Sequence, residues 1–201
     1  MANKLAKIIA LVFHPVLIPT LSFFLLLNSG FYFSFLSWEA KRIILLIVLF
    51  STAIMPLLAM SVLALHPKFS LSFEKGSQRA LPLFLSSIFY YMGYLLMNRL
   101  NAYPILKVIM IASVLVVLGL LVISLKWKIS GHMAALGALT GSLLALSFRT
   151  GIYPMWIIIA VILATGLTGS AQLILKKNKL WHLEAGYALG FSLLYLVIWY
   201  I

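Results

Sequence analysis

Three short segments of this chain hold polar and basic residues whose types could bind a phosphate group and move a proton beside it. They read FEKGSQRALP (73–82), KWKISGH (126–132) and GSAQLILKKNKLWHLEAG (169–186). Lysine attracts a phosphate as a point charge, whereas arginine holds it with two parallel N–H groups. A histidine can donate or accept a proton near neutral pH. The three segments together therefore contain the residue types of an anion site with a proton donor.

The second segment places a Ser-Gly-His sequence directly before an apolar run. Ser130 stands where an N-cap would, and the free N–H groups of the following turn favour an anion. Gly131 would let an oxyanion approach the backbone, with Lys128 close by. His132 would lie in the first helical turn as a proton donor. The alternative interpretation is an ordinary helix cap, with His132 as a buried structural polar group.

The first segment offers two cations, because Lys75 and Arg79 stand about one helical turn apart and can face the same way. The alternative is that they and the neighbouring lysines only set the orientation of the chain in a membrane.

The elements that must position these segments are membrane-spanning helices. The chain is 64% hydrophobic and 9% charged, whereas soluble domains are about 45–50% apolar and about 25% charged. We therefore expect residues 1–201 to form a single all-α, polytopic transmembrane helical bundle. There is no cysteine, and the four histidines lack matched spacing, so we expect no metal and no cofactor.

A membrane span needs about 20 apolar residues, and the sequence contains seven such runs. They cover residues 8–28, 42–65, 80–98, 104–125, 131–148, 152–175 and 183–201. We interpret the first run as a retained span, since it is longer than the apolar region of a signal peptide. An even number of crossings separates the three polar segments, so all three should lie on the side of the membrane that holds the N-terminus. The small residues of GALTG and GLTGSA predict close packing between spans five and six.

Basic residues are concentrated on that same side. Ten of the fifteen Lys and Arg residues fall there, namely Lys4, Lys7, Lys68, Lys75, Arg79, Lys126, Lys128, Lys176, Lys177 and Lys179. The positive-inside rule then predicts a cytoplasmic N-terminus. The net charge of +12 also suits membrane lipids with anionic headgroups as partners. We expect no binding of nucleic acid, because there is no soluble module in which basic and aromatic residues alternate.

The order of the three segments resembles the phosphatidic acid phosphatase type 2 / haloperoxidase superfamily, over about residues 70–195. Its motifs are K-x6-RP, PSGH and SR-x5-H-x3-D. ISGH keeps the Ser-Gly-His of the second motif, with Ile129 in place of proline. KGSQRALP offers the Lys, Arg and Pro of the first motif, with three residues between the cations instead of six. FHPVLIPT and WKISGHM are most similar to a Bacteroidetes membrane subgroup, which implies a bacterial inner (cytoplasmic) membrane.

The resemblance implies a metal-free hydrolase that acts on a lipid phosphate or isoprenoid pyrophosphate. In the family, the third-motif histidine attacks phosphorus, its aspartate orients that histidine, and the second-motif histidine protonates the leaving group. In this chain, Gln172 stands at the arginine position, Asn178 at the nucleophile position and His182 at the aspartate position. An amide can supply neither the attacking imidazole nor the cation, so the third motif is degraded and a pseudoenzyme is one expectation.

Three functions stay open at this point. In the first, His182 replaces the missing nucleophile with Glu184 nearby, His132 acts as the proton donor, and the protein is a lipid phosphatase. In the second, the protein binds a phospholipid, an isoprenoid phosphate or a partner protein through the same pocket without catalysis. In the third, it is a small lipid carrier subunit, although the sequence shows no repeat symmetry and no acidic coupling residue deep within a span. The sequence does not predict an oligomeric state.

Overall fold

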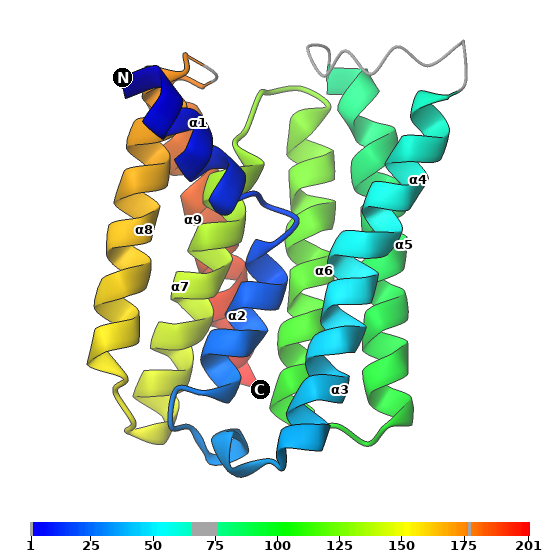
Figure 1. Cartoon of the computed structure of the whole chain (residues 1–201), viewed down its shortest axis with the longest axis vertical. Helices are drawn as coiled ribbons and strands as arrows, with labels where there is room; N and C mark the ends of the chain where they lie inside the picture. Colours follow the sequence, from blue (N-terminus) through cyan, green and yellow to red (C-terminus); the bar gives the residue numbers. More distant parts are fainter. Residues whose placement is uncertain (1, 66–75, 177) are drawn as a thin grey trace.

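The chain folds as a bundle of helices (Figure 1). The structure, a computed structural model, describes residues 2–65, 76–176 and 178–201, and the side chains of residues 2 and 76–79 are not described. The elements are α1 (Ala2–Val12), α2 (Ile18–Leu27), the 3-10 turn η1 (Tyr32–Phe35), α3 (Trp38–Leu49), the π-helical segment η2 (Phe50–Ile54), α4 (Met55–Ala64), α5 (Gly76–Arg99), α6 (Pro104–Ser124), α7 (Gly131–Thr150), α8 (Met155–Ile174) and α9 (Leu180–Tyr200).

Within the described residues, six helices are long and apolar enough to cross a membrane, when α3, η2 and α4 are counted as one. The predicted all-α transmembrane bundle is therefore confirmed. The boundaries of the last six predicted spans differ by only a few residues from those of the helices. The chain is an integral membrane protein by the length and composition of these helices.

The predicted first span, residues 8–28, is wrong as one continuous helix. α1 ends at Val12 and α2 begins at Ile18, and His14 and Pro15 lie in the break. Pro15 has no N–H to donate and disfavours the helical conformation of the residue before it. The two short helices together still run from one end of the bundle to the other (Figure 1). As predicted, the chain termini therefore lie at opposite ends.

The polar segments gather at the end of the bundle that holds the N-terminus. The loop of residues 125–130 between α6 and α7 lies there, as do the end of α8 and the start of α9, and α5 begins there (Figure 1). The predicted common side is therefore confirmed for the second and third segments. Residues 73–75 of the first segment, Lys75 among them, lie outside the described residues.

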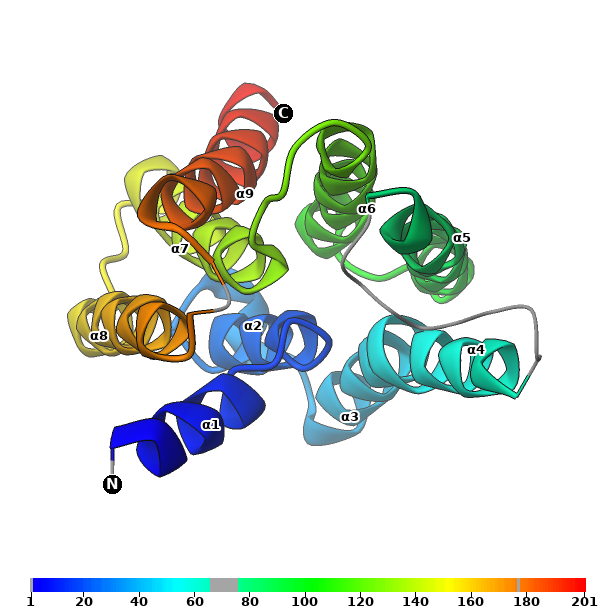
Figure 2. The same cartoon turned by 90° about the horizontal axis from the view of Figure 1, so that it is seen from above.

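α7 is the central helix of the half of the bundle that carries these loops. Over an 18-residue window, 67% of α7 is buried, against 22% for α8. Seen from above, α7 lies among α2, α8 and α9 (Figure 2), and it contacts all three. The first turn of α7 is thus fixed by several helices at once.

α7 and α9 approach each other backbone to backbone. A Cβ atom added to Gly137 of α7 would lie 2.3 Å from the carbonyl oxygen of Tyr187 on α9. A Cβ atom added to Gly190 of α9 would lie 1.9 Å from the carbonyl oxygen of Ala134 on α7. Both distances are far below van der Waals contact, so only glycine allows this helix pair to pack so closely.

The predicted partner of the span-five glycines is therefore wrong, because they pack on α9 and not on α8. Gly166 of α8 has no atom within 4 Å of an added Cβ, and Gly169 meets only the side chain of Met133, at 3.8 Å. A pattern of small residues predicts a close approach but does not name the helix that approaches. The glycines of α9, Gly186 and Gly190, supply the matching pattern.

Substitution of Gly190 by alanine should destabilise the protein. The added methyl group would meet backbone atoms of α7, and such overpacking costs about 1–3 kcal/mol. Gly166→Ala is the matched control, because its methyl group would enter open space, and alanine favours a helix over glycine by about 0.5–1 kcal/mol. Denaturation of both purified variants in detergent measures this difference. Equal stabilities would contradict the described α7–α9 contact.

Candidate phosphate-binding end of the bundle

The Ser-Gly-His segment opens α7 as predicted. Ser130 is the N-cap, and its Oγ accepts the N–H of Met133 at 3.4 Å. Ser130 is also tied to α9, because its own N–H donates to the carbonyl oxygen of His182 at 3.1 Å. Next to it, an added Cβ on Gly131 would have no atom within 4 Å. The first turn of α7 is thus held against α9 while Gly131 faces open space.

His132 contacts the broken N-terminal helix pair. Its Nε2 lies 3.3 Å from the carbonyl oxygen of Ala10 in the last turn of α1, and its ring meets that of His14 edge-on at 5.5 Å. The break explains the first contact, because the N–H of His14 donates to Leu11 and not to Ala10. A histidine that bonds the last carbonyls of a helix acts as a C-terminal cap. His132 therefore links α1 to α7.

The amides of the third segment bond to each other. Nδ2 of Asn178 donates to Oε1 of Gln172 at 3.1 Å. Gln172 is 1% exposed, and its Nε2 has no hydrogen-bond partner among the described residues. The buried hydroxyl of Thr168, one turn earlier on α8, likewise lacks one. We refer to Thr168, Gln172 and Asn178 as the polar cluster.

The polar cluster leaves two buried hydrogen-bond donors without a partner in the described part of the chain. Such a group costs about 1–3 kcal/mol when it is left unsatisfied. A water molecule or the oxygen of a ligand would remove that cost. The motif positions in the sequence predict Gln172 and Asn178 as site residues but do not include Thr168. The available signal was the four-residue spacing of Thr168 and Gln172, which places two polar side chains on one face of a largely apolar helix.

His182 takes part in the N-terminal cap of α9. Its Nδ1 accepts the backbone N–H of Lys179 at 3.0 Å, and its ring lies 4.1 Å from that of Trp181. In a neutral imidazole, one nitrogen accepts and the other carries the proton. The bond from Lys179 therefore assigns the proton of neutral His182 to Nε2. Glu184 is exposed to the outside of the bundle, and His182 is 8% exposed.

The remaining predicted site residues are described only in part. Lys128 is exposed on the loop before α7. Arg79 belongs to α5, and its side chain is not described, while Lys75 lies outside the described residues. Their place in a common pocket stays a prediction. Within the described ranges, no group of three or more His, Asp and Glu side chains could hold a metal ion.

The site thus brings some predicted residues together and separates others. Ser130 and His182 share a backbone hydrogen bond, and Gln172 and Asn178 share a side-chain hydrogen bond. His132 instead contacts α1. Comparison with protein-family models, with curated proteins and with solved structures finds no match.

Substitution of His132 by alanine should loosen α1. The carbonyl of Ala10 would lose its side-chain donor, at a cost of about 1 kcal/mol. His132→Gln is the matched control, because a glutamine amide can also donate. Hydrogen exchange of backbone amides in residues 3–14 reports the change, with faster exchange in the alanine variant than in the glutamine variant. Exchange that stays as slow as in the unaltered protein would show that His132 does not hold α1.

Proposed function

We propose that this protein binds a lipid with a phosphate headgroup at the end of the bundle where α7 and α9 begin and α8 ends, and that it does not hydrolyse that lipid. The observation that carries the proposal is the hydrogen bond from the Lys179 N–H to Nδ1 of His182.

That bond opposes the role that a phosphatase mechanism needs from His182. An attacking imidazole needs one unprotonated nitrogen aimed at phosphorus, with the other N–H held by a carboxylate. In the neutral ring of His182, Nδ1 already accepts a proton donor, and Nε2 then carries a hydrogen and has no lone pair for attack. Asn178, at the nucleophile position, has no imidazole and is bonded to Gln172. Binding without turnover fits this set of groups.

Several groups at this end suit the oxygens of a phosphate. The N–H groups of the first turn of α7 begin at Gly131, where the backbone is open. The polar cluster has two buried donors available for an oxygen, Thr168 Oγ1 and Gln172 Nε2. Lys128 on the adjoining loop adds a positive charge. A neutral amide loses less hydration than a guanidinium when it is buried, so Gln172 is a suitable donor at a buried position.

Hydrolysis is the second candidate, and one observation favours it. The bond from the Ser130 N–H to the His182 carbonyl holds the second and third segments together, as a shared active site would require. In this case His132 would protonate the leaving group, and His182 would attack after rearrangement of its cap. The reaction would be a metal-free hydrolysis of a phosphate or pyrophosphate lipid.

The binding proposal is tested by a matched pair of threonine variants on α8. Thr168→Val removes a buried unpaired hydroxyl at nearly constant volume, so the affinity for phosphatidic acid should fall by about tenfold or more. The stability without lipid should stay equal or rise. Thr165→Val is the control, because the Thr165 hydroxyl donates to Val161 of its own helix. Ligand-induced shifts of the unfolding temperature in detergent give both quantities, with phosphatidylcholine as the uncharged-headgroup comparison.

A parallel assay separates binding from hydrolysis. Phosphate release from phosphatidic acid, phosphatidylglycerophosphate and undecaprenyl pyrophosphate should be at background. Turnover that both His132→Ala and His182→Ala abolish would favour the hydrolase instead. Equal phosphatidic acid affinities of Thr168→Val and Thr165→Val would contradict the polar cluster as the headgroup site.

We further propose that the protein lies in a bacterial inner membrane with its N-terminus in the cytoplasm. The basis is the excess of Lys and Arg at that end of the chain's helices. The chain has no cysteine, so single cysteines report sidedness cleanly. In intact cells, a membrane-impermeant maleimide should label Lys107→Cys and leave Lys128→Cys unlabelled until the membrane is opened. The reverse labelling would invert the proposed orientation.

A further inference from the structure

A cavity of about 180 Å³ lies inside the bundle, between α2, the η2–α4 segment, α5, α6 and α7. Its lining is mostly apolar, and none of the described residues that line it is charged. At one end it reaches Gly131, the residue at the start of α7. The residues of the polar cluster do not line it. The cavity therefore adjoins the proposed headgroup site at Gly131 but is distinct from the polar cluster.

Two interrupted helices form one wall of this cavity. Pro15 lines it from the break between α1 and α2, Pro19 from the first turn of α2, and Pro56 from the start of α4. Before Pro56, the N–H of Met55 bonds the carbonyl of Phe50, five residues back, which widens the helix into a π turn. Within membranes, interrupted helices are tolerated where they are buried in protein or line a cavity, and they form the binding sites of many transporters. The interruptions here meet at one cavity.

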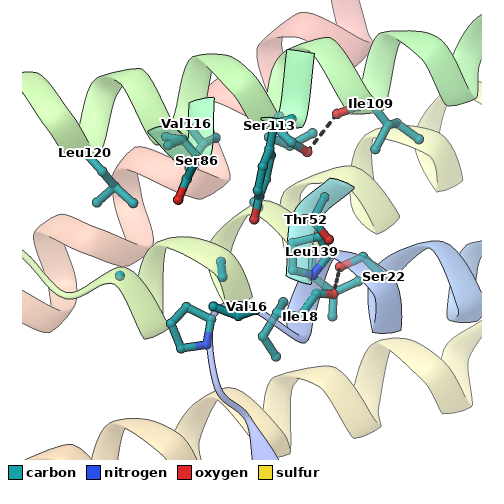
Figure 3. A pocket seen from close by; sticks show the side chains of 18 of the residues that line it. Val16, Ile18, Ser22, Thr52, Ser86, Ile109, Ser113, Val116, Leu120 and Leu139 are labelled. Carbon is teal, nitrogen blue, oxygen red and sulfur yellow. Dashed lines mark hydrogen bonds between the residues drawn. The ribbon is translucent and has the colours of Figure 1, made fainter. Parts of the chain in front are cut away.

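Hydroxyl groups surround the cavity on several helices. They belong to Ser22, Thr52, Ser86, Tyr90, Ser113 and Ser142. Ser86 and Ser113 lie on one side of the space, and Thr52 and Ser22 lie on the other (Figure 3).

Each serine or threonine hydroxyl donates its hydrogen bond to a backbone carbonyl of its own helix. Ser113 donates to Ile109 at 2.8 Å and Thr52 donates to Val48 at 2.8 Å. The same local bond is made by Ser22, Ser86 and Ser142. What these oxygens still offer to the cavity is their lone pairs. The wall is therefore mostly apolar, and its serine and threonine oxygens are hydrogen-bond acceptors.

We propose that the cavity binds an uncharged lipid with a hydroxyl group, a long-chain alcohol. A charged group would find no counter-charge there and would be costly to bury. An O–H group supplies the donor that the serine and threonine oxygens lack. The size fits one hydrocarbon segment, since an apolar cavity of about 150 Å³ already binds benzene. This proposal goes beyond the headgroup site, because its ligand carries no phosphate.

The test uses a long-chain alcohol with a diazirine in its chain, and the alkane of equal length with the same diazirine. After irradiation of the purified full chain in detergent, the alcohol should cross-link to residues of α2, α5, α6 and α7 around the cavity. An excess of 1-hexadecanol should compete, whereas hexadecane should compete less well. Cross-links confined to outward-facing residues such as Leu163, which is 62% exposed, would overturn the proposal.

Variants distinguish the effect of the hydroxyl groups on binding from the effect of the cavity's volume. Thr52→Val and Ser113→Ala each remove one hydrogen-bond acceptor. The cross-linking yield of the alcohol should fall about two- to tenfold, whereas the cross-linking yield of the alkane should stay unchanged. Ser192→Ala on α9 is the matched control, because Ser192 is exposed and outside the cavity. Ala135→Phe should fill the cavity and abolish both cross-links. Equal cross-linking yields for the alcohol and the alkane in every folded variant would show that the hydroxyl oxygens do not favour the alcohol, which would contradict the proposal.

The outcome is independent of the headgroup proposal. Thr168→Val should keep its cross-links to the alcohol even though it loses affinity for phosphatidic acid. Loss of the alcohol cross-links in Thr168→Val would indicate that the alcohol and the phosphate headgroup share one site, and it would contradict a separate ligand in the cavity.

Discussion

The close contact between α7 and α9 is the constraint on which the rest of the structure depends. Glycines on both helices let the two backbones touch, and the contact continues to the N-terminal end of the bundle, where an added Cβ on Gly186 would lie 2.5 Å from the carbonyl oxygen of Ser130. The same approach allows the N–H of Ser130 to bond the carbonyl of His182. The cap of α7 and the cap of α9 are therefore in direct backbone contact.

The break at Pro15 is the second organising feature, and it acts on two places at once. It ends α1 early enough that the carbonyl of Ala10 needs a donor from elsewhere, and His132 provides one. It also brings proline side chains to the wall of the central cavity. A residue that resembles a catalytic acid in sequence thereby joins the N-terminal helix to the bundle. His132, for which the motif suggested the role of proton donor, thus has a structural role as a link between α1 and α7.

Much of the architecture could be predicted from the sequence, because apolar runs and a Ser-Gly start are local signals. The ends of α6 and the N-cap at Ser130 follow from them. The break after Val12 could not be placed, since membrane helices often contain proline without breaking. The ring nitrogen of His182 that carries the proton could not be predicted either, because it depends on a hydrogen bond from the backbone N–H of Lys179, three residues away. Side-chain partners and helix partners are set by tertiary packing, and a single sequence names neither.

The tautomer of His182 distinguishes most directly between an end of the bundle that holds a phosphate group and one that attacks it. The ring nitrogens can be assigned by 15N NMR on protein labelled at histidine, with His182→Gln identifying the signals. The expected result is an unprotonated, hydrogen-bonded Nδ1 with the proton on Nε2. A proton on Nδ1 with a bare Nε2 would restore His182 as a nucleophile and contradict the claim.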